Sequence, residues 1–544
     1  MTPPPPLWTA WTLAALFVAA IAIPGLVLLV HGPRNEIHVE ESRRLAPIPT
    51  LPASLEDARK LPRHINAFLD DHFGFRPLLL RAHAHLLYYV LRASPSPKVL
   101  LGRDGFLFLK GQPDVDGDPI TDFRGTLPLI PYQLERWRWQ FEEQRIWLRQ
   151  FGIDYVIAII PSKASIYPEN LPRHIRNHRF PPSALEQVID HLSRTLSVPV
   201  LDLTRPMSLA RENVQVYQRT DTHWTDDGGL AATEAILHAL KPTHPRANLP
   251  PDSFWTREPF ISTEGDLVRM IGLTGTKTEP LIRIRPAHPR ATVTPLSDHP
   301  LTDISATLDD PDKLSVLLFH DSFGHYLKPI LPDLFRAIRF RWTNLGLEPH
   351  LVAEHQPDVV ITLMAERRLR LGQRYPVEIQ QAGAGYLFGV SETVLGHWDG
   401  TRLDHALDAL DSGVTLAPGQ RGLLIDAPHP VPHLQLPPIH GADRNIPVLR
   451  IDFDADYAGD LTLVWETRDP ASWPGHHAPL LRAPVRQGFN RIYFPLIDPE
   501  MTGASYLQFG PRGGRGELLE LEIRSRPRDE PLPLPPLSVA DATI

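Results

Sequence analysis

The chain contains no cysteine among its 544 residues, and it has no excess of basic residues. The first absence excludes disulfide bonds, thiolate nucleophiles and cysteine-ligated zinc. It leaves the compartment open, because many exported bacterial proteins also lack cysteine. Lysine and arginine total 55 against 63 acidic residues, so the formal net charge is −8. An acidic chain without a basic stripe gives no electrostatic basis for binding nucleic acid, and we expect no such partner.

The overall composition is that of a folded protein. Hydrophobic residues make up 42% of the chain and charged residues 22%, which is the balance found in globular proteins. A chain of 544 residues exceeds what one ordinary core supports, so we expect two or more domains.

An uncharged apolar run occupies residues 7–30. It is long enough to cross roughly 30 Å of hydrocarbon as a helix, and Pro24 would kink that helix without forbidding it. A cleaved signal peptide is the alternative, because Ala-Ile-Ala at 20–22 resembles a cleavage site. No lysine or arginine precedes the run, however, and the run is long for a signal peptide. We therefore predict an uncleaved transmembrane anchor, although Arg34 on the far side mildly opposes an N-inside topology.

Apolar runs alternate with helical patterns between residues 99 and 371. The runs predict buried strands and the segments between them predict helices. The expected strands are 155–160, 198–203, 314–319 and 358–364, and the expected helices are 131–151, 182–196 and 228–240. Strands separated by helices indicate a three-layer α/β/α domain with a parallel sheet covered on both faces.

Short alternating strands separated by glycine, proline and aspartate replace this pattern beyond residue 389. They predict a β-sandwich, a candidate carbohydrate-binding module. Trp465, Trp473 and Tyr493 either stack on sugars or pack in the core of this domain, and both interpretations stay open.

The expected organisation follows from these changes in pattern. The predicted parts are a short tail at 1–6, the anchor at 7–30, a tether at 31–54, a helical lead-in at 55–98, the α/β domain at 99–375, a linker at 376–410, the β-sandwich at 411–528 and a disordered tail at 529–544.

Two short segments carry the residue types of a serine hydrolase. In the segment 220–224 (TDTHW), Asp221 and His223 are two residues apart and project to the same side of an extended chain, so the carboxylate can orient the imidazole. The segment 320–324 (HDSFG) follows a predicted strand, and a serine on such a turn exposes its hydroxyl beside backbone N–H groups. Ser322, His223 and Asp221 therefore match a nucleophile, a base and an orienting carboxylate.

Each segment alone also has an ordinary structural explanation. Asp-Ser is common as a helix cap, and Asp-x-His is common as a hydrogen-bonded pair or as part of a metal site. No cluster of His, Asp and Glu elsewhere in the sequence has the spacing of a metal site, so we expect neither a metal nor a cofactor. The joint occurrence of the two segments in one α/β domain favours catalysis.

The region from residue 61 to about 371 resembles the alginate O-acetyltransferase family of periplasmic, SGNH-hydrolase-like polysaccharide acetyltransferases. The motifs that carry the resemblance are DHFGFR at 71–76, GRDGFLF at 102–108, PSKASIYP at 161–168, GDL at 265–267, and DTHW at 221–224 preceding DSF at 321–323. Ordinary SGNH hydrolases place the serine block first, so the order here is permuted.

The resemblance implies Ser322 as nucleophile, His223 as base and Asp221 as orienting residue. It also makes Tyr326 and Arg367 candidates for substrate binding or for the oxyanion site.

Lys163 is a further candidate for that role, and a structural role at the end of a strand explains it equally well. His320 stands where the family has glycine, and no Gly-x-Asn-Asp block is visible. Oxyanion donors beyond the Ser322 N–H group are therefore not named.

The implied activity is O-acetylation of exopolysaccharide hydroxyls through an acetyl-serine intermediate. Acetyl-CoA is not expected outside the cytoplasm, so the resemblance implies a membrane-bound acyltransferase partner that supplies acetyl groups. It also implies a single-pass protein of the inner membrane with its catalytic domain in the periplasm. A polysaccharide acetyl esterase with the same triad and a non-catalytic carbohydrate-binding scaffold of an export complex are the alternatives. Alginate, cellulose and other polymers remain open as acceptors.

Overall fold

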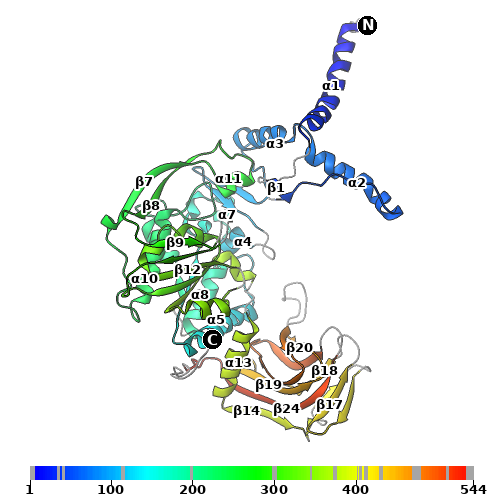
Figure 1. The fold of residues 1–544 in the computed structure, drawn as a ribbon, viewed down its shortest axis with the longest axis vertical. Helices are drawn as coiled ribbons and strands as arrows, with labels where there is room; N and C mark the ends of the chain where they lie inside the picture. The colour runs from blue at the N-terminus through cyan, green and yellow to red at the C-terminus, as the bar shows by residue number, and fades with distance from the viewer. Residues whose placement is uncertain are drawn as a thin grey trace.

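The computed structural model describes residues 7–533 with short internal gaps. The residues outside the description are 1–6, 33–36, 39–42, 112–116, 197–199, 297–302, 344–345, 372–375, 401, 404–406, 410–413, 428–432, 469–479, 510–513 and 534–544. Figure 1 shows an α/β body, a second body built of strands, and the helices α1 (Leu7–His31), α2 (Leu55–His72) and α3 (Arg76–His85), which extend from the first body at its N-terminal side.

A seven-stranded sheet forms the centre of the α/β body. Its strands, in spatial order, are β6 (Val200–Asp202), β5 (Asp154–Ile160), β13 (Val359–Ala365), β11 (Ser315–His320), β12 (Ala337–Trp342), β10 (Ile304–Thr307) and β9 (Thr292–Pro295). The first five run parallel, whereas β10 and β9 are antiparallel additions at one edge. The expected α/β fold with a parallel sheet is present in these five strands, and the antiparallel edge formed by β10 and β9 was not predicted. The edge strands escape the sequence pattern because they are short and partly exposed rather than uniformly apolar.

Both faces of the sheet are covered, because alternate side chains of each strand point to opposite sides. Along β5, Val156 and Ala158 enter one core while Ile157 and Ile159 enter another. The first core is closed by α9 (Thr204–Ala210) and α10 (Asp226–Leu240); the second is closed by α5 (Pro131–Gln150), α8 (Ala184–Thr195) and α12 (Pro349–His355).

Shorter elements surround the sheet. They are β3 (Val99–Leu101), β4 (Leu107–Leu109), α4 (Pro119–Arg124), α6 (Lys163–Ile166), η2 (Pro168–Asn170), α7 (Arg173–Arg176), η3 (Asp252–Phe254), β7 (Trp255–Ser262), α11 (Asp266–Met270), β8 (Glu279–Pro286), η4 (Ser322–Leu327), η5 (Pro332–Leu334) and η6 (Glu366–Arg370). The turn between β3 and β4 has Asp104 and Gly105 both at positive φ.

The second body consists of two antiparallel sheets on one shared core, which is the arrangement of a β-sandwich. One sheet contains β14 (Thr393–Asp399), β16 (Thr415–Pro418), β17 (Leu423–Ala427), β19 (Asn445–Ala455), β22 (Gly488–Pro495) and β24 (Gly514–Pro527). The other contains β15 (Asp408–Ala409), β18 (His433–Gln435), β20 (Gly459–Thr467), β21 (Leu480–Val485) and β23 (Met501–Phe509).

One expectation for the C-terminal part needs correction, and the structure decides between the two interpretations that were open for Trp465. The stretch 376–410, expected to be a linker, contains α13 (Val377–Val390), which packs on α5, and β14, which pairs with β24. Trp465 is fully buried and its indole N–H donates to Asp498, so it belongs to the core and does not face a sugar. Tyr493 packs on Phe388 of α13.

Two further expectations, for Trp473 and for the tail at 529–544, concern residues that lie wholly or largely outside the part of the chain that the structure describes. Trp473 lies among residues that the structure does not describe, as does most of the tail expected to be disordered. The start of that tail is ordered: Leu532 is buried in the core of the β-sandwich.

Helix α5 joins the two bodies. Its side chains enter both the second core of the α/β body and the core of the β-sandwich. Glu135 of α5 is buried, and one of its carboxylate oxygens lies 3.3 Å from Arg138 and 3.0 Å from Arg528, which follows β24. Its other oxygen lies 3.1 Å from His191 of α8. One carboxylate therefore binds groups from three parts of the chain.

We expect Glu135→Ala to lower the free energy of unfolding by about 3–5 kcal/mol, because it leaves buried arginines without their shared carboxylate. The matched control is Asp190→Ala, which breaks an exposed pair with Arg194 and should cost only about 0.3–0.5 kcal/mol. Chemical denaturation followed by tryptophan fluorescence measures both variants. Equal effects in the two variants would contradict this account of the interface.

Candidate active site

The two candidate segments, 220–224 and 320–324, meet where the central strands end. Strands β5, β13 and β11 are parallel neighbours, so their carboxyl ends lie at the same edge of the sheet. Open α/β sheets bind their ligands at this edge. Ser322 begins η4 directly after β11, and the segment that carries Asp221 and His223 reaches the same place from the loop before α10.

The three expected residues form one continuous hydrogen-bond chain. The Nε2 atom of His223 lies 2.7 Å from the Ser322 hydroxyl oxygen, and its Nδ1 atom lies 2.6 Å from Oδ1 of Asp221. The backbone N–H of His223 also donates to Oδ1 of Asp221 over 2.9 Å. In this arrangement the imidazole can accept the serine proton on one side while the carboxylate fixes its other nitrogen.

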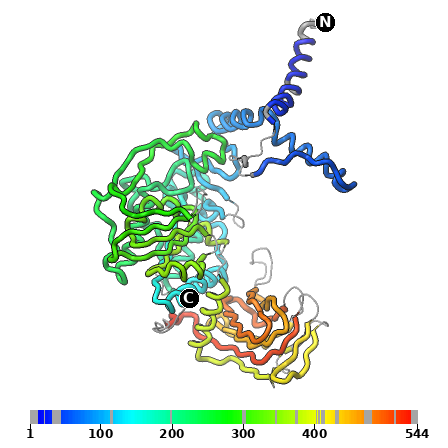
Figure 2. The backbone as a smooth tube through the Cα atoms, in the orientation of Figure 1, coloured from blue at the N-terminus to red at the C-terminus, as the bar shows by residue number. Residues whose placement is uncertain are grey.

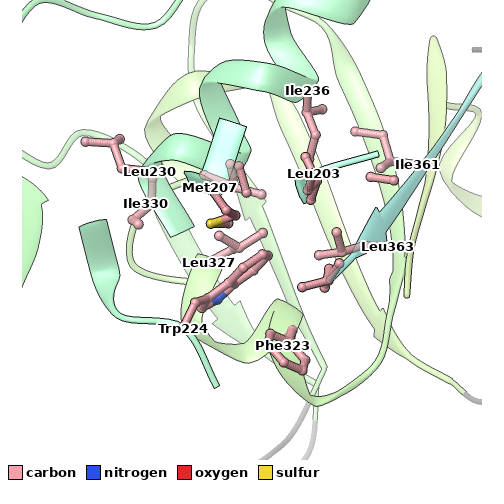
Figure 3. Close-up of a cluster of buried hydrophobic side chains, with 14 of the residues drawn as sticks. Leu203, Met207, Trp224, Leu230, Ile236, Phe323, Leu327, Ile330, Ile361 and Leu363 are labelled. Carbon is pink, nitrogen blue, oxygen red and sulfur yellow. The ribbon is translucent and has the colours of Figure 1, made fainter. Parts of the chain in front are cut away.

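Two buried aromatic side chains hold the motifs together. Trp224 follows His223 and Phe323 follows Ser322 in the sequence, and both are buried in the first core of the sheet. Their rings meet edge to face, with centroids 5.2 Å apart. Figure 3 shows both among the aliphatic side chains of this core. His223 and Ser322 are therefore each followed by an aromatic residue that is fixed in the hydrophobic core.

The turn that carries Ser322 is tied to the end of β13. Asp321 accepts hydrogen bonds from the N–H groups of Phe323, over 3.0 Å, and of Ala365, over 2.8 Å. A side chain at Gly324 would lie 2.2 Å from the ring of His320, so only glycine fits there. Ser322 is the first residue of η4, a 3₁₀ helix of six residues.

Lys163 holds the segment that carries the base. Its buried ammonium donates to the backbone carbonyl oxygens of Gln218, Arg219 and Asp221, at 2.8, 3.3 and 2.6 Å. Burial lowers its pKa to about 8, against the opposing effect of nearby carboxylates. The Lys163 ammonium therefore donates its hydrogen bonds to the protein backbone, and in this way it positions the segment that carries Asp221 and His223.

Glu279 and Asp266 also bind the segment that carries Asp221 and His223, and the sequence did not suggest a role for either carboxylate. Glu279 is buried and accepts hydrogen bonds from the N–H groups of Arg219 and Thr220, over 2.7 and 3.0 Å. Glu279 is the first residue of β8, and no motif in the sequence marks it as a residue that would reach the site.

Asp266 is the second of these carboxylates. Its own N–H donates to Oδ2 of Asp221 over 2.8 Å, and its carboxylate accepts from the N–H of Thr222 over 2.7 Å. It also accepts from the Thr222 hydroxyl. A side chain at Gly265 would lie 2.2 Å from the carbonyl oxygen of Thr220, so the close approach requires glycine. The GDL motif at 265–267 was the available signal.

The charges around the base favour its protonated form. Burial opposes this, but Asp221 and then Asp266, 3.9 Å from Nδ1, outweigh burial and raise the pKa of His223. Burial would likewise raise the pKa of Asp221, yet the charge and hydrogen bond of His223 lower it below its ordinary value. Asp221, His223 and Asp266 each offer a possible metal ligand within 4.8 Å of the others, but these atoms already take part in the hydrogen bonds described.

Tyr326 and Arg367, the remaining candidates, both lie at the site. The Tyr326 ring stacks on His223 with centroids 5.0 Å apart, while its hydroxyl is hydrogen-bonded to the side chain of Gln218. Arg367 is half-buried beside a pocket at the ends of β5 and β13, and its charge acts to lower the pKa of His223. Glu366 also lines this pocket, where burial raises its pKa to about 8.

Comparison with known proteins assigns the domain. Residues 99–359 match the family described as SGNH hydrolase-like domain, acetyltransferase AlgX. The probable alginate O-acetylase AlgJ of Pseudomonas aeruginosa is 29% identical over 221 residues, which cover 39% of this chain and 51% of that protein. The protein of the same name from Azotobacter vinelandii is 33% identical over 189 residues, 34% of this chain and 44% of that protein. The chain thus spans about half the length, or less, of these curated relatives.

Solved structures give a weaker comparison. The O-acetyltransferase domain of Pseudomonas putida AlgJ is 23% identical with a TM-score of 0.37, covering 53% of this chain and 99% of that domain. Pseudomonas aeruginosa AlgX is 13% identical with a TM-score of 0.36, covering 79% of this chain and 94% of that one. At TM-scores below 0.5 the structural likeness adds no argument, so the assignment rests on the sequence match.

The α/β sheet and the matched region define the class: the domain is SGNH hydrolase-like. Within that class, residues 99–359 are similar to the family described as acetyltransferase AlgX, which agrees with the resemblance that the motifs predicted.

His320 makes the stability of this site depend on pH. The ring is buried beneath η4, its Nδ1 lies 2.6 Å from the Asp321 carbonyl oxygen, and burial lowers its pKa to about 4. A histidine whose pKa is lowered in the folded state stabilises the fold above its ordinary pKa, and this contribution is lost as the pH falls. We expect His320 to account for a loss on the order of 3 kcal/mol between pH 6.5 and 4.

Unfolding titrations at pH 7 and pH 4.5 measure this contribution. In His320→Asn, an amide can replace Nδ1 but has no proton to gain, so the difference between the two pH values should shrink. His350→Asn, at an exposed histidine, is the control and should behave as wild type. An unchanged pH dependence in His320→Asn would contradict the prediction.

Proposed function

We propose that the chain is an O-acetyltransferase in which Ser322 is the nucleophile, His223 the general base and Asp221 the residue that orients the base. The observation that carries the proposal is the hydrogen-bond chain from Asp221 through His223 to Ser322. The family match and the names of the curated relatives support acetyl transfer as the reaction.

The first half-reaction acetylates the serine. The Oγ atom of Ser322 attacks the acetyl carbonyl carbon of a donor while Nε2 of His223 takes the hydroxyl proton. The new bond from Oγ to carbon forms, the bond from carbon to the donor's leaving oxygen breaks, and His223 returns the proton to that oxygen. Asp221 stabilises the imidazolium that forms between these steps.

The second half-reaction transfers the acetyl group. An acceptor hydroxyl loses its proton to His223 and attacks the acetyl-serine, and the proton then returns to Oγ as the serine leaves. We propose that the acceptor is an exopolysaccharide, since the curated relatives are named alginate O-acetylases. Water in place of the sugar would make the same site an esterase, so the acceptor decides between the two activities.

The setting of the reaction is part of the proposal. Helix α1 (Leu7–His31) contains one candidate membrane span, Trp11–Val30, which a signal sequence near the N-terminus would also explain. We propose that it anchors the chain in the inner membrane, with the α/β domain in the periplasm. The donor would then come from a membrane-bound acyltransferase.

We expect Ser322→Ala to reduce acetyl transfer by a factor on the order of 10⁴ or more, because it removes the nucleophile. His223→Ala should lose a similar amount, and the double variant should be scarcely slower, since the two residues act as one unit. Asp221→Asn should keep the ring in place and favour the wrong tautomer, with a somewhat smaller loss. Circular dichroism should show folded protein in each case; retained activity in Ser322→Ala would refute the assignment.

The covalent intermediate gives an independent test. Wild-type protein incubated with an activated acetyl ester and then digested should show an added acetyl mass on the Ser322 peptide. The modification should accumulate when no sugar acceptor is present and decrease when a polysaccharide acceptor is added. Acetyl mass found on other peptides alone would contradict the mechanism, and release into water at the same rate with and without sugar would favour the esterase.

A further inference from the structure

Three helices at the N-terminal end meet at one corner. They are α1, α2 (Leu55–His72) and α3 (Arg76–His85), with η1 (Leu86–Val90) continuing α3. Figures 1 and 2 show α1 projecting from the junction of α2 and α3, while the sheet lies on the other side of α3. The candidate membrane span in α1 has a mean hydropathy of 2.8 and is almost entirely exposed.

The corner between α2 and α3 packs against the apolar part of α1. A side chain at Gly74 would lie 2.6 Å from the carbonyl oxygen of Pro24 and 2.7 Å from Val27, so the two backbones approach closely. Asp71 and His72, just before the corner, are hydrogen-bonded to the backbone of Ala46 at 2.8 and 2.9 Å. The corner is therefore tied both to α1 and to the segment that follows it.

This contact fixes the depth of the corner if α1 spans a bilayer. Pro24 and Val27 precede Val30, the last residue of the apolar span, by six and three residues. At 1.5 Å per residue they lie about 5–9 Å inside the end of the span. Interfacial helices bury their apolar face about 5–10 Å into the boundary between headgroups and acyl chains, so the corner lies at the depth that such a face reaches.

The side chains around the corner suit that environment. His72 and Ala84 are the buried residues of α2 and α3, whereas the large apolar side chains are exposed to water. The exposed apolar residues of this region are Leu55, Ile65, Leu69, Phe73, Leu78, Leu79, Leu86, Tyr89, Val90 and Leu91. This many exposed large apolar side chains on two neighbouring helices and η1 points to a binding surface for a membrane or a protein.

The other side of α3 and η1 leads to the active site. Ala84 and Tyr88 pack with Leu267 and Val268 of α11 in a small separate core. The first residue of α11 is Asp266, which hydrogen-bonds to the segment that carries the base. A membrane that fixed the position of α3 would therefore also fix α11, whose Asp266 supports the segment that carries Asp221 and His223.

We propose that α2, α3 and η1 form an interfacial membrane element that lies in the lipid headgroup region beside α1 and fixes the active site above the bilayer. The occupant of the apolar surface is lipid, because the corner lies against the span itself at interfacial depth. The inference rests on the membrane anchoring within the proposed function. It gives a structural reason for acetyl transfer close to the membrane, where a donor embedded in the bilayer would be reached.

The absence of cysteine from the chain allows a direct test, because each introduced cysteine carries one label. Full-length Leu69→Cys, Leu79→Cys, Leu16→Cys and Ile261→Cys variants would be labelled with an environment-sensitive fluorophore. Each would be reconstituted into phosphatidylcholine–phosphatidylglycerol vesicles with and without a lipid that carries a quencher. Ile261 is the matched control, because it is apolar and exposed on β7, outside α1, α2, α3 and η1.

We expect labels at positions 16, 69 and 79 to lose about half or more of their fluorescence to the lipid quencher, and the label at 261 to lose almost none. Quenching at 16 without quenching at 69 and 79 would overturn the interfacial element alone. Loss of quenching at all three would overturn the anchor and the element together. Labels at 69 and 79 that are shielded from water but not quenched would assign the surface to protein, and would also overturn the proposal. Acetylation of Ser322 is measured separately, so its outcome distinguishes failure of the chemistry from failure of the membrane placement.

Discussion

The contact between Trp224 and Phe323 is the constraint on which the candidate site depends. The base and the nucleophile are 99 residues apart in the sequence, yet their hydrogen bond tolerates only a few tenths of an ångström of displacement. A loop with its backbone in water could not hold that distance. Placing a large aromatic residue directly after each catalytic residue, and packing the two rings together in the core, gives both motifs the rigidity of the sheet.

The segment that carries the base is held by buried charges on either side. Lys163 binds its carbonyl oxygens, and Glu279 and Asp266 bind its N–H groups. Backbone groups removed from water need such partners, since each unpaired one costs free energy. The same groups that satisfy the backbone also set the electrostatics: the negative charge of Asp266 beside Asp221 favours the imidazolium. Asp266 therefore both helps to position the segment and raises the pKa of His223.

The α/β domain also contacts the structures that would bring substrates to it. On one side α5 and α13 share cores with the β-sandwich, so the two bodies are joined by packing rather than by a flexible linker. On the other side α3 packs on α11 next to the active site. A polymer held by the β-sandwich and a donor held in the membrane would approach the site from parts of the chain that are rigidly connected to it.

The sequence by itself determined the class of fold, the apolar span, the three residues of the hydrogen-bond chain and the family that the α/β domain resembles. These depend on local signals: apolar runs of strand length, a carboxylate two residues from a histidine, and a serine directly after a buried strand. The tertiary structure alone decided which groups support them. The role of Lys163 was open between substrate and backbone until Gln218 and Asp221 were seen around it. Glu279 had no signal at all, because its contacts come from a segment about 60 residues away. Trp465 shows the same limit, since an aromatic residue in a strand has the same pattern whether it faces a sugar or the core, and only the opposite sheet decides.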